Sequence, residues 1–115
     1  TRLRDEKWLD DARFAAAYVR TAALKKKGRL RIRRELIGAG VANDSIAEAI
    51  AANVDAEGER ERAAAAARRR LPILVRRYGA DAARNKLRAY LLKQGYEGSL
   101  VREILEEMTA MSSRA

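Results

Sequence analysis

The side chains able to carry chemistry in this sequence are carboxylates and basic groups, because the chain contains no cysteine and no histidine. The usual zinc ligands, the thiolate nucleophile and the usual neutral-pH proton shuttle are therefore absent together. The adjacent pairs Asp10–Asp11 and Glu106–Glu107 come nearest to an acid–base pair. Neighbouring residues of a helix point in different directions, so charge at helix ends explains these pairs better than catalysis. We expect no enzymatic activity, no metal, no cofactor and no small-molecule substrate.

Basic residues are concentrated in two stretches and give the 115-residue chain a formal net charge of +9. This excess favours an anionic partner, such as nucleic acid, a nucleoprotein, an anionic membrane surface or an acidic protein. The first stretch contains Lys25, Lys26, Lys27, Arg29, Arg31, Arg33 and Arg34, and the second contains Arg68, Arg69, Arg70, Arg76 and Arg77. Aromatic side chains do not alternate with the first stretch, so the stacking platform of a dedicated single-strand binder is missing.

Helical phase divides the first stretch into two groups, because successive residues of a helix are about 100° apart. Arg29 and Arg33 fall on the apolar side of the expected helix, where a guanidinium must reach solvent or a carboxylate. Arg88 has the same phase as Arg33 in the second half of the chain. We therefore predict structural roles for Arg33 and Arg88, with Asp11 and Glu48 as candidate partners.

Arg31 and Arg34 fall on the opposite side of the same expected helix. We predict that they contact a partner, together with the lysines that precede Gly28 and the second basic stretch. The predicted partner-binding residues are Lys25, Lys26, Lys27, Arg31, Arg34, Arg68, Arg69, Arg70, Arg76 and Arg77. For any one of them, the alternative is an ordinary solvated helix face.

The spacing of apolar residues predicts a chain that is almost entirely helical. The expected helices cover residues 9–26, 29–39, 44–54, 57–78, 81–94 and 99–111. Gly40 and Gly95 follow two of these ranges, as expected where helices end. Pro72 lies inside the fourth range, so we expect a kink or a restart near residue 71.

A shift of 55 positions aligns the sequence with itself in both chemistry and helical phase. The aligned pairs are Ile32–Leu87, Arg33–Arg88, Leu36–Leu91, Ile37–Leu92, Gly40–Gly95, Ile46–Val101 and Ile50–Leu105. This period predicts an all-α fold of tandem three-helix repeats, elongated and curved. We expect one repeat at residues 9–54, a second at 55–115, and the tail of a preceding repeat or a linker at 1–8.

Several other residues are predicted to be structural. Trp8 and Tyr96 are expected to pack at unit junctions. The predicted structural set is Asp11, Phe14, Arg33, Leu36, Gly40, Arg88 and Gly95. No apolar run approaches the roughly 20 residues that span a bilayer, and the first residues lack the apolar core of a signal peptide. We expect a soluble, cytoplasmic protein with no membrane partner.

The run WLDDARFAAAYVRTAALKKKGRLRIRRELIGAGV, residues 8–41, resembles the signature of the RecX family of recombinase regulators. In that signature an aspartate pair precedes Arg-Phe-Ala, a basic turn with glycine follows, and an arginine-rich helix ends in glycine and an apolar residue. The corresponding residues here are Asp10, Asp11, Arg13, Phe14, Ala15, Gly28, Arg31, Arg33, Arg34, Leu36, Gly40 and Val41. The closing LLKQGYEGSLVREIL is similar to the last unit of that family.

The resemblance implies tandem three-helix repeats that bind the RecA filament on single-stranded DNA. Family members are thought to lodge in the helical groove of the filament, to limit its growth and to suppress ATP hydrolysis and strand exchange. The resemblance also implies an effect on co-protease activity and roles in recombination, DNA repair and the SOS response. We expect contact with single-stranded DNA through the filament, with direct DNA binding as an alternative. Family members usually carry three units, whereas two units and the expected tail of another are predicted in this chain.

A stand-alone helix-turn-helix DNA-binding module is the competing interpretation, built from residues 29–39 and 44–54. Its presumed recognition helix, DSIAEAIAANV, has two acidic residues and no basic one, so it would repel phosphates. Sequence-selective binding of naked duplex DNA with a steep salt dependence would favour this module.

Overall fold

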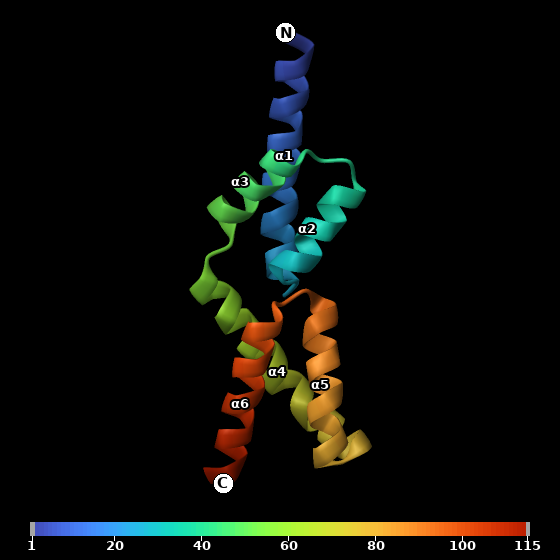
Figure 1. Cartoon of the computed structure of the whole chain (residues 1–115), viewed down its shortest axis with the longest axis vertical. Helices are drawn as coiled ribbons and strands as arrows, with labels where there is room; N and C mark the ends of the chain where they lie inside the picture. Colours follow the sequence, from blue (N-terminus) through green and yellow to red (C-terminus); the bar gives the residue numbers. More distant parts are fainter. Residues whose placement is uncertain (1, 115) are drawn as a thin grey trace.

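The computed structural model describes the backbone of residues 2–114 and the side chains of residues 6–109. Its helices are α1 (Arg2–Leu24), α2 (Arg29–Gly38), α3 (Asn43–Asn53), α4 (Ala56–Tyr78), α5 (Ala80–Gln94) and α6 (Gly98–Arg114). No strand occurs in this part of the chain (Figure 1), which confirms the predicted all-α class. The molecule is elongated, as predicted, with principal extents of 62 × 23 × 20 Å.

The first helix is longer than the apolar spacing predicts, because α1 begins at Arg2 rather than at residue 9. Residues 2–8 contain no glycine or proline that would break a helix. Asp10 and Asp11 therefore lie within α1, and the explanation of this pair by helix-end charge is wrong. Asp11 instead accepts a 3.4 Å hydrogen bond from the backbone N–H of Ala42, which ties the turn between α2 and α3 to α1.

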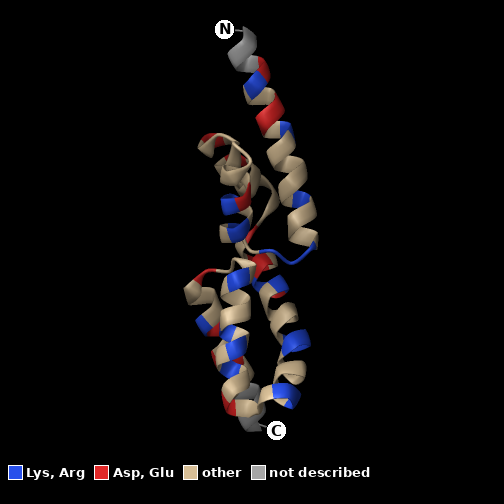
Figure 2. Ribbon diagram, turned by 90° about the vertical axis from the view of Figure 1, so that its right-hand side faces the viewer, with Lys and Arg blue, Asp and Glu red and all other residues tan. Residues whose placement is uncertain are grey.

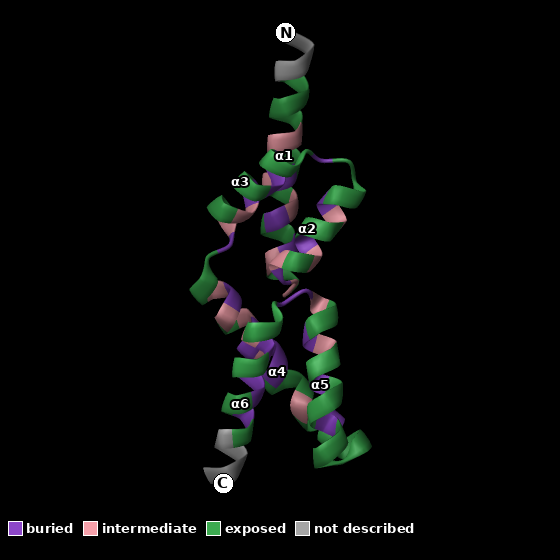
Figure 3. Ribbon diagram, viewed as in Figure 1, coloured by how far each residue is buried: buried purple, intermediate pink, exposed green. Residues whose placement is uncertain are grey.

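The two halves of the chain repeat both the order of helices and the pattern of burial. We call α1–α3 the first unit and α4–α6 the second unit. Leu36 of α2 and Leu91 of α5, 55 positions apart, are both fully buried. The equivalence extends to the surface, where Ile37 and Leu92 are 50% and 41% exposed. The tandem repeat predicted from the sequence is thus visible in the pattern of burial (Figure 3).

Equivalent helices nevertheless pack differently in the two units. In the first unit α1 packs mainly against α3, whereas in the second unit α4 packs mainly against α5. The buried residues form two separate clusters, one in each unit, with no residue in common. The molecule therefore has two small hydrophobic cores rather than a continuous one.

The units meet at a narrow junction, where the start of α2 rests on the turn between α5 and α6. The backbone N–H of Gly28 donates to the carbonyl of Gln94 at 2.8 Å, and that of Leu30 donates to the carbonyl of Gly95 at 3.0 Å. The first N–H groups of a helix have no acceptor within it. The second unit therefore caps the N-terminus of α2.

Two glycines allow this close approach of backbones. A Cβ atom added to Gly28 would lie 2.4 Å from the carbonyl carbon of Gly95, and Gly95 itself has a φ of +102°. Next to it, Tyr96 is fully buried, and its hydroxyl donates to the carbonyl of Lys26 at 2.5 Å. The prediction that Tyr96 packs at a unit junction is confirmed, whereas Trp8 is 46% exposed.

Helix α4 continues through Pro72 without interruption. The predicted restart near residue 71 is therefore wrong. Proline removes the hydrogen bond to the carbonyl four residues earlier, which belongs to Arg68. Both Pro72 and Arg68 are exposed, so water can replace that bond and the helix continues.

Candidate partner-binding site

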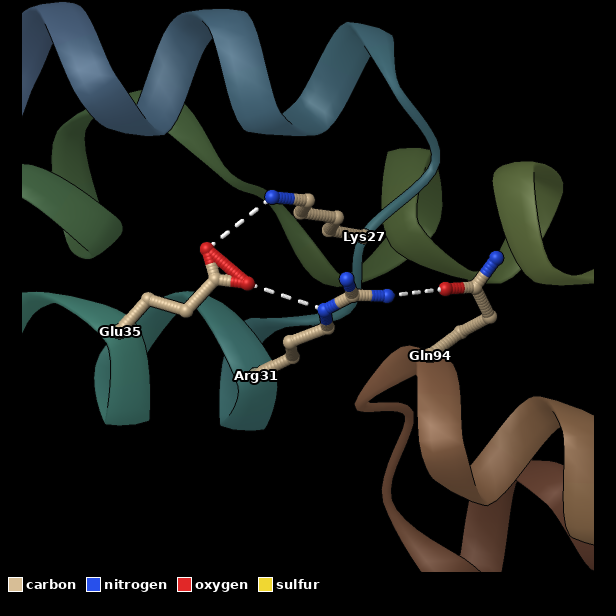
Figure 4. Close-up of polar contacts among 4 residues, drawn as sticks. All are labelled: Lys27, Arg31, Glu35 and Gln94. Atoms are coloured by element: carbon tan, nitrogen blue, oxygen red, sulfur yellow. Dashed lines mark hydrogen bonds and ion pairs between the residues drawn. The ribbon is translucent and has the colours of Figure 1, made fainter.

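Lys27, Arg31 and Glu35 form a cluster of ion pairs on the first-unit side of the junction. The Nζ of Lys27 lies 3.0 Å from Oε2 of Glu35, and the Nε of Arg31 lies 2.9 Å from Oε1. The other end of the Arg31 guanidinium donates from Nη1 to Oε1 of Gln94 at 2.5 Å. Figure 4 shows the two cations around Glu35, with Arg31 reaching across to the second unit. The cluster thus links the two units.

Lys27 is more enclosed than Lys25, the first lysine of the basic turn. Its side chain is 19% exposed, and its Nζ lies 5.8 Å from the centre of the Tyr18 ring. Burial lowers the pKa of the Lys27 ammonium, and the neighbouring charges of Arg31 and Lys25 lower it further. Lys25 is exposed. Lys25 therefore presents its charge more freely to a partner than Lys27 does.

Arg31 and Arg34 both lie on the side of α2 away from the first core, as predicted, but only Arg34 is open to solvent. The Arg31 side chain is 35% exposed and has two polar partners. Helical phase relates each residue to the core of its own unit. The face of α2 opposite that core meets the second unit at Arg31, a contact that no local pattern in the sequence indicates.

Among the arginines predicted to lie on the apolar side, Arg29 has a carboxylate partner, whereas Arg33 and Arg88 have none among the described residues. Arg29 needs a carboxylate, as expected, but the carboxylate comes from Glu59 of α4 rather than from Asp11 or Glu48. Glu59 accepts from the Arg29 backbone N–H at 2.8 Å and from its Nε at 2.7 Å. The Glu59 side chain is only 4% exposed, and its hydrogen bond raises the pKa of Arg29. Glu59 is a site residue that sequence reasoning missed, because 30 residues separate it from Arg29.

Arg33 and Arg88 are exposed, so their predicted orientation toward the core is wrong. Neither has an ion-pair or hydrogen-bond partner among the described residues. Each instead borders a groove between the second and third helices of its unit. A position on the edge of the apolar stripe therefore opens to solvent, because the two helices do not close over it.

The second basic stretch lies on the exposed surface of α4. The guanidinium of Arg70 lies 4.9 Å from the centre of the Tyr90 ring, and that of Arg77 lies 5.4 Å from the centre of the Tyr78 ring. The residues Arg68, Arg69 and Arg76 have no polar partner in the described part of the chain. Helix α4 runs from the junction toward the far end of the second unit (Figure 1), so the two basic stretches do not form one patch.

The remaining predicted structural residues are placed in different ways. Leu36 is fully buried, and Gly40 and Gly95 have φ angles of +85° and +102° after α2 and α5, as expected. Phe14, however, is 50% exposed and stacks on Tyr18 with ring centres 6.1 Å apart. Because α3 covers the side of α1 that carries the buried alanines and Val19, Phe14 lies beside that contact.

The described residues contain neither a metal-binding cluster nor a membrane-spanning helix. They include no group of three or more acidic side chains arranged to hold a metal ion. In the same part of the chain, no helix combines the length and apolar character needed to cross a membrane.

Comparison with known proteins gives one consistent family. Residues 10–50 match the family model described as RecX, second three-helix domain. The chain is 36% identical over 106 residues to the regulatory protein RecX of Xanthomonas campestris, and 33% identical over 107 residues to that of Clostridium botulinum. These alignments cover 88% and 91% of this chain, but 60% and 49% of the relatives.

The regulatory protein RecX of Xanthomonas citri is similar to the same extent, at 37% identity over 106 residues. The chain thus spans about half to three fifths of the length of the curated relatives it matches. The matched family domain includes α2, α3 up to residue 50 and most of α1, and the alignments extend over most of both units. The chain belongs to the RecX family.

Proposed function

We propose that this protein regulates a RecA recombinase by binding its filament on single-stranded DNA, in the helical groove of that filament. Binding there modulates ATP hydrolysis, strand exchange and co-protease activity in recombination, DNA repair and the SOS response. The observation that supports this most directly is the match of residues 10–50 to a RecX domain, because these residues contain the basic turn and α2.

The shape and charge of the molecule are consistent with such a partner. A body 62 Å long and little more than 20 Å wide can follow an extended groove. Lysines and arginines recur along its length (Figure 2), with Lys25–Lys27 at the turn near mid-height. A nucleoprotein filament is polyanionic through its DNA, so basic side chains distributed in this way favour association.

Exposure and polar partners divide the basic residues into those that we propose to contact the filament and those that we assign to the junction. Lys25 and Arg34 are exposed and have no polar partner among the described residues. Lys26 is half-buried, with a φ of +62°. We assign Lys27 and Arg31 to positioning the junction, because both are bound to Glu35. The α4 arginines at positions 68, 69 and 76 form a second contact region in this proposal.

Charge reversal at the free positions tests the proposed site. The double variant Lys25→Glu/Arg34→Glu is expected to bind RecA filaments about tenfold or more weakly, since it reverses two exposed charges that face an anionic partner. Binding is measured by pull-down with filaments on circular single-stranded DNA, and regulation by the ATPase rate of the same filaments. Naked single-stranded DNA is the comparison.

The matched control is Arg13→Glu/Arg20→Glu, which makes the same change in charge at exposed positions of α1. Circular dichroism establishes that both variants remain helical. Filament binding by Lys25→Glu/Arg34→Glu at the level of the control would refute this site. No binding of the unaltered protein to RecA filaments would refute the function itself.

The structure gives no support to the helix-turn-helix alternative. The presumed recognition helix corresponds to α3, where Asp44 and Glu48 are both exposed. Two exposed carboxylates on that helix oppose its approach to the phosphates of a duplex.

A further inference from the structure

A groove between α5 and α6 brings three arginines together in the second unit. Arg84 and Arg88 lie one turn apart on α5, and Arg102 faces them from α6. The groove has a volume of about 400 Å³, and Leu92 and Leu105 provide apolar surface beside the arginines. Its lining includes no carboxylate. No local sequence pattern marks this site, because its arginines come from two helices and from no basic run.

The charges of this groove are largely unpaired. Arg84 donates from Nη1 to the carbonyl of Leu105 at 3.4 Å and to the hydroxyl of Thr109. Arg88 and Arg102 have no hydrogen-bond or ion-pair partner in the part of the chain that the structure describes. Three guanidinium groups that share one groove repel one another, so an anion bound between them relieves that repulsion.

The first unit contains the equivalent groove, between α2 and α3, with a volume of about 360 Å³. A shift of 55 positions relates the two linings. Arg29, Leu30, Arg33, Ala47 and Ile50 correspond in order to Arg84, Asn85, Arg88, Arg102 and Leu105. The two grooves therefore occupy the same place in the repeat but differ in charge.

The groove of the first unit indicates which chemistry suits this place in the repeat. Its lining includes the carboxylate-bearing residue Glu97, which comes from the following unit. Beside this groove, Arg29 is bound by the carboxylate of Glu59, also from the following unit. At the position equivalent to Arg29, Arg84 receives no carboxylate from any described residue. The groove of the second unit thus lacks the acidic side chain that lines its counterpart.

We propose that the groove between α5 and α6 binds an acidic, partly apolar peptide segment of a protein partner. Carboxylates of the segment pair with Arg88 and Arg102, and an apolar side chain packs on Leu92 and Leu105. Guanidinium groups match carboxylates in planar, two-point hydrogen bonding, and arginine is enriched at the energetic centres of protein interfaces. The inference goes beyond the proposed function, since it does not require the partner to be a recombinase.

A peptide fits this groove better than a nucleic acid does. No aromatic side chain lines the groove, so bases have no surface on which to stack. The apolar surface from Leu92 and Leu105 would not make favourable contacts with a charged phosphodiester backbone. The acidic group that lines the equivalent groove is a glutamate side chain, that of Glu97.

The test uses the full chain and a fluorescein-labelled peptide of alternating aspartate and leucine. Its affinity is measured by fluorescence anisotropy for the unaltered protein, for Arg88→Glu/Arg102→Glu, and for the matched control Arg13→Glu/Arg20→Glu. The groove variant is expected to bind the peptide about tenfold or more weakly, and the control within about twofold of the unaltered protein. A peptide with asparagine in place of aspartate is expected to bind no variant well.

Two results would overturn the proposal. The first is equal peptide binding by the groove variant and the control, which would indicate attraction to net charge alone. The second is that the groove variant loses affinity for an oligothymidine strand but not for the peptide. The groove would then be a nucleic-acid site.

Separate results would refute the proposed filament binding and the proposed peptide binding in the groove. Lys25→Glu/Arg34→Glu leaves the groove intact and is expected to bind the peptide normally, even if it no longer binds RecA filaments. Normal peptide binding with no filament binding by the unaltered protein would refute the proposed function and retain the groove.

Discussion

Tyr96 shows how one side chain joins the two units. It is fully buried in the core of the second unit, and its hydroxyl donates to the carbonyl of Lys26 in the basic turn of the first. Burial raises the pKa of this phenol to about 12. In the unfolded chain the same group ionises at about 10. The neutral phenol is therefore part of what holds the units together.

Replacing Tyr96 by phenylalanine is expected to cost about 1 kcal/mol of folding free energy at neutral pH, through the lost hydrogen bond. Because the folded-state pKa is raised, the contribution of ionisation to stability is complete below about pH 10 and is lost as pH rises through about 12. The stability difference between the two proteins should therefore shrink over this range. Urea denaturation at pH 8, 10 and 11.5 measures it, and a constant difference would contradict the assignment.

Arg29 and Arg31 show which contacts of a single residue can be predicted from helical phase and which cannot. Helical phase indicated that Arg29 must reach solvent or a carboxylate, which is a local requirement of its own helix. That it pairs with the carboxylate of Glu59 depends on how a helix 30 residues away packs. The contact of Arg31 was not predicted for the same reason, since its partner Gln94 is 63 residues away in sequence. The partners of these residues depend on how the two units are arranged, and no local sequence pattern encodes that arrangement.

At the scale of helices, the sequence predicted all six, and most of their ends to within a few residues. Apolar spacing and glycines carry this information, because both act within a few residues. The largest error was the start of α1, where a mostly polar sequence extends the helix without an apolar stripe. The restart predicted at Pro72 was also wrong, because its position on the exposed side of α4 lowers the cost of the lost hydrogen bond.

Gly28, just before α2, and Gly38, the last residue of α2, provide a matched test of how the start of this helix meets the second unit. Gly28→Ala is expected to destabilise the protein by about 1–3 kcal/mol, because the new methyl group would collide with the backbone of Gly95 and Tyr96. Its φ of −81° is acceptable for alanine, so a loss would come from the collision alone. Gly38→Ala, with no atom within 4 Å of its added Cβ, is expected to be neutral or stabilising by up to about 1 kcal/mol.

Chemical denaturation followed by circular dichroism compares these two variants with the unaltered protein. Equal stability of Gly28→Ala and Gly38→Ala would show that the first turn of α2 moves freely against the second unit. That result would contradict the tight backbone contact at the junction.

At the scale of the whole molecule, the sequence predicted the repeat but not how its units are joined. The period of 55 residues identifies equivalent positions such as Leu36 and Leu91, which are equally buried. It does not show that α1 packs mainly on α3 while α4 packs mainly on α5. Nor does it reveal that Gly28 and Gly95 form the centre of a narrow junction. These features depend on contacts between units, for which a single sequence holds no periodic signal.

Two separate cores joined by a narrow junction lead to a prediction about unfolding. Leu36→Ala removes a fully buried side chain from the first core and is expected to cost about 2–5 kcal/mol. In repeat architectures, stability is a sum of unit terms and interface terms. The loss should therefore appear mainly as faster amide hydrogen exchange in α1–α3, while α4–α6 retain most of their protection.

Leu91→Ala, the equivalent change in the second core, is the matched variant and should give the reverse pattern. Hydrogen exchange measured by mass spectrometry on peptides from each unit distinguishes the two cases. A uniform loss of protection across both units, from either variant, would mean that the junction couples the cores into one cooperative body. In that case the hydrogen bonds from Gly28 and Leu30 to the second unit, with the Arg29–Glu59 pair, would outweigh the separation of the cores. Partial protection of the unaltered unit would then appear only after these contacts are weakened, for example in the Gly28→Ala background.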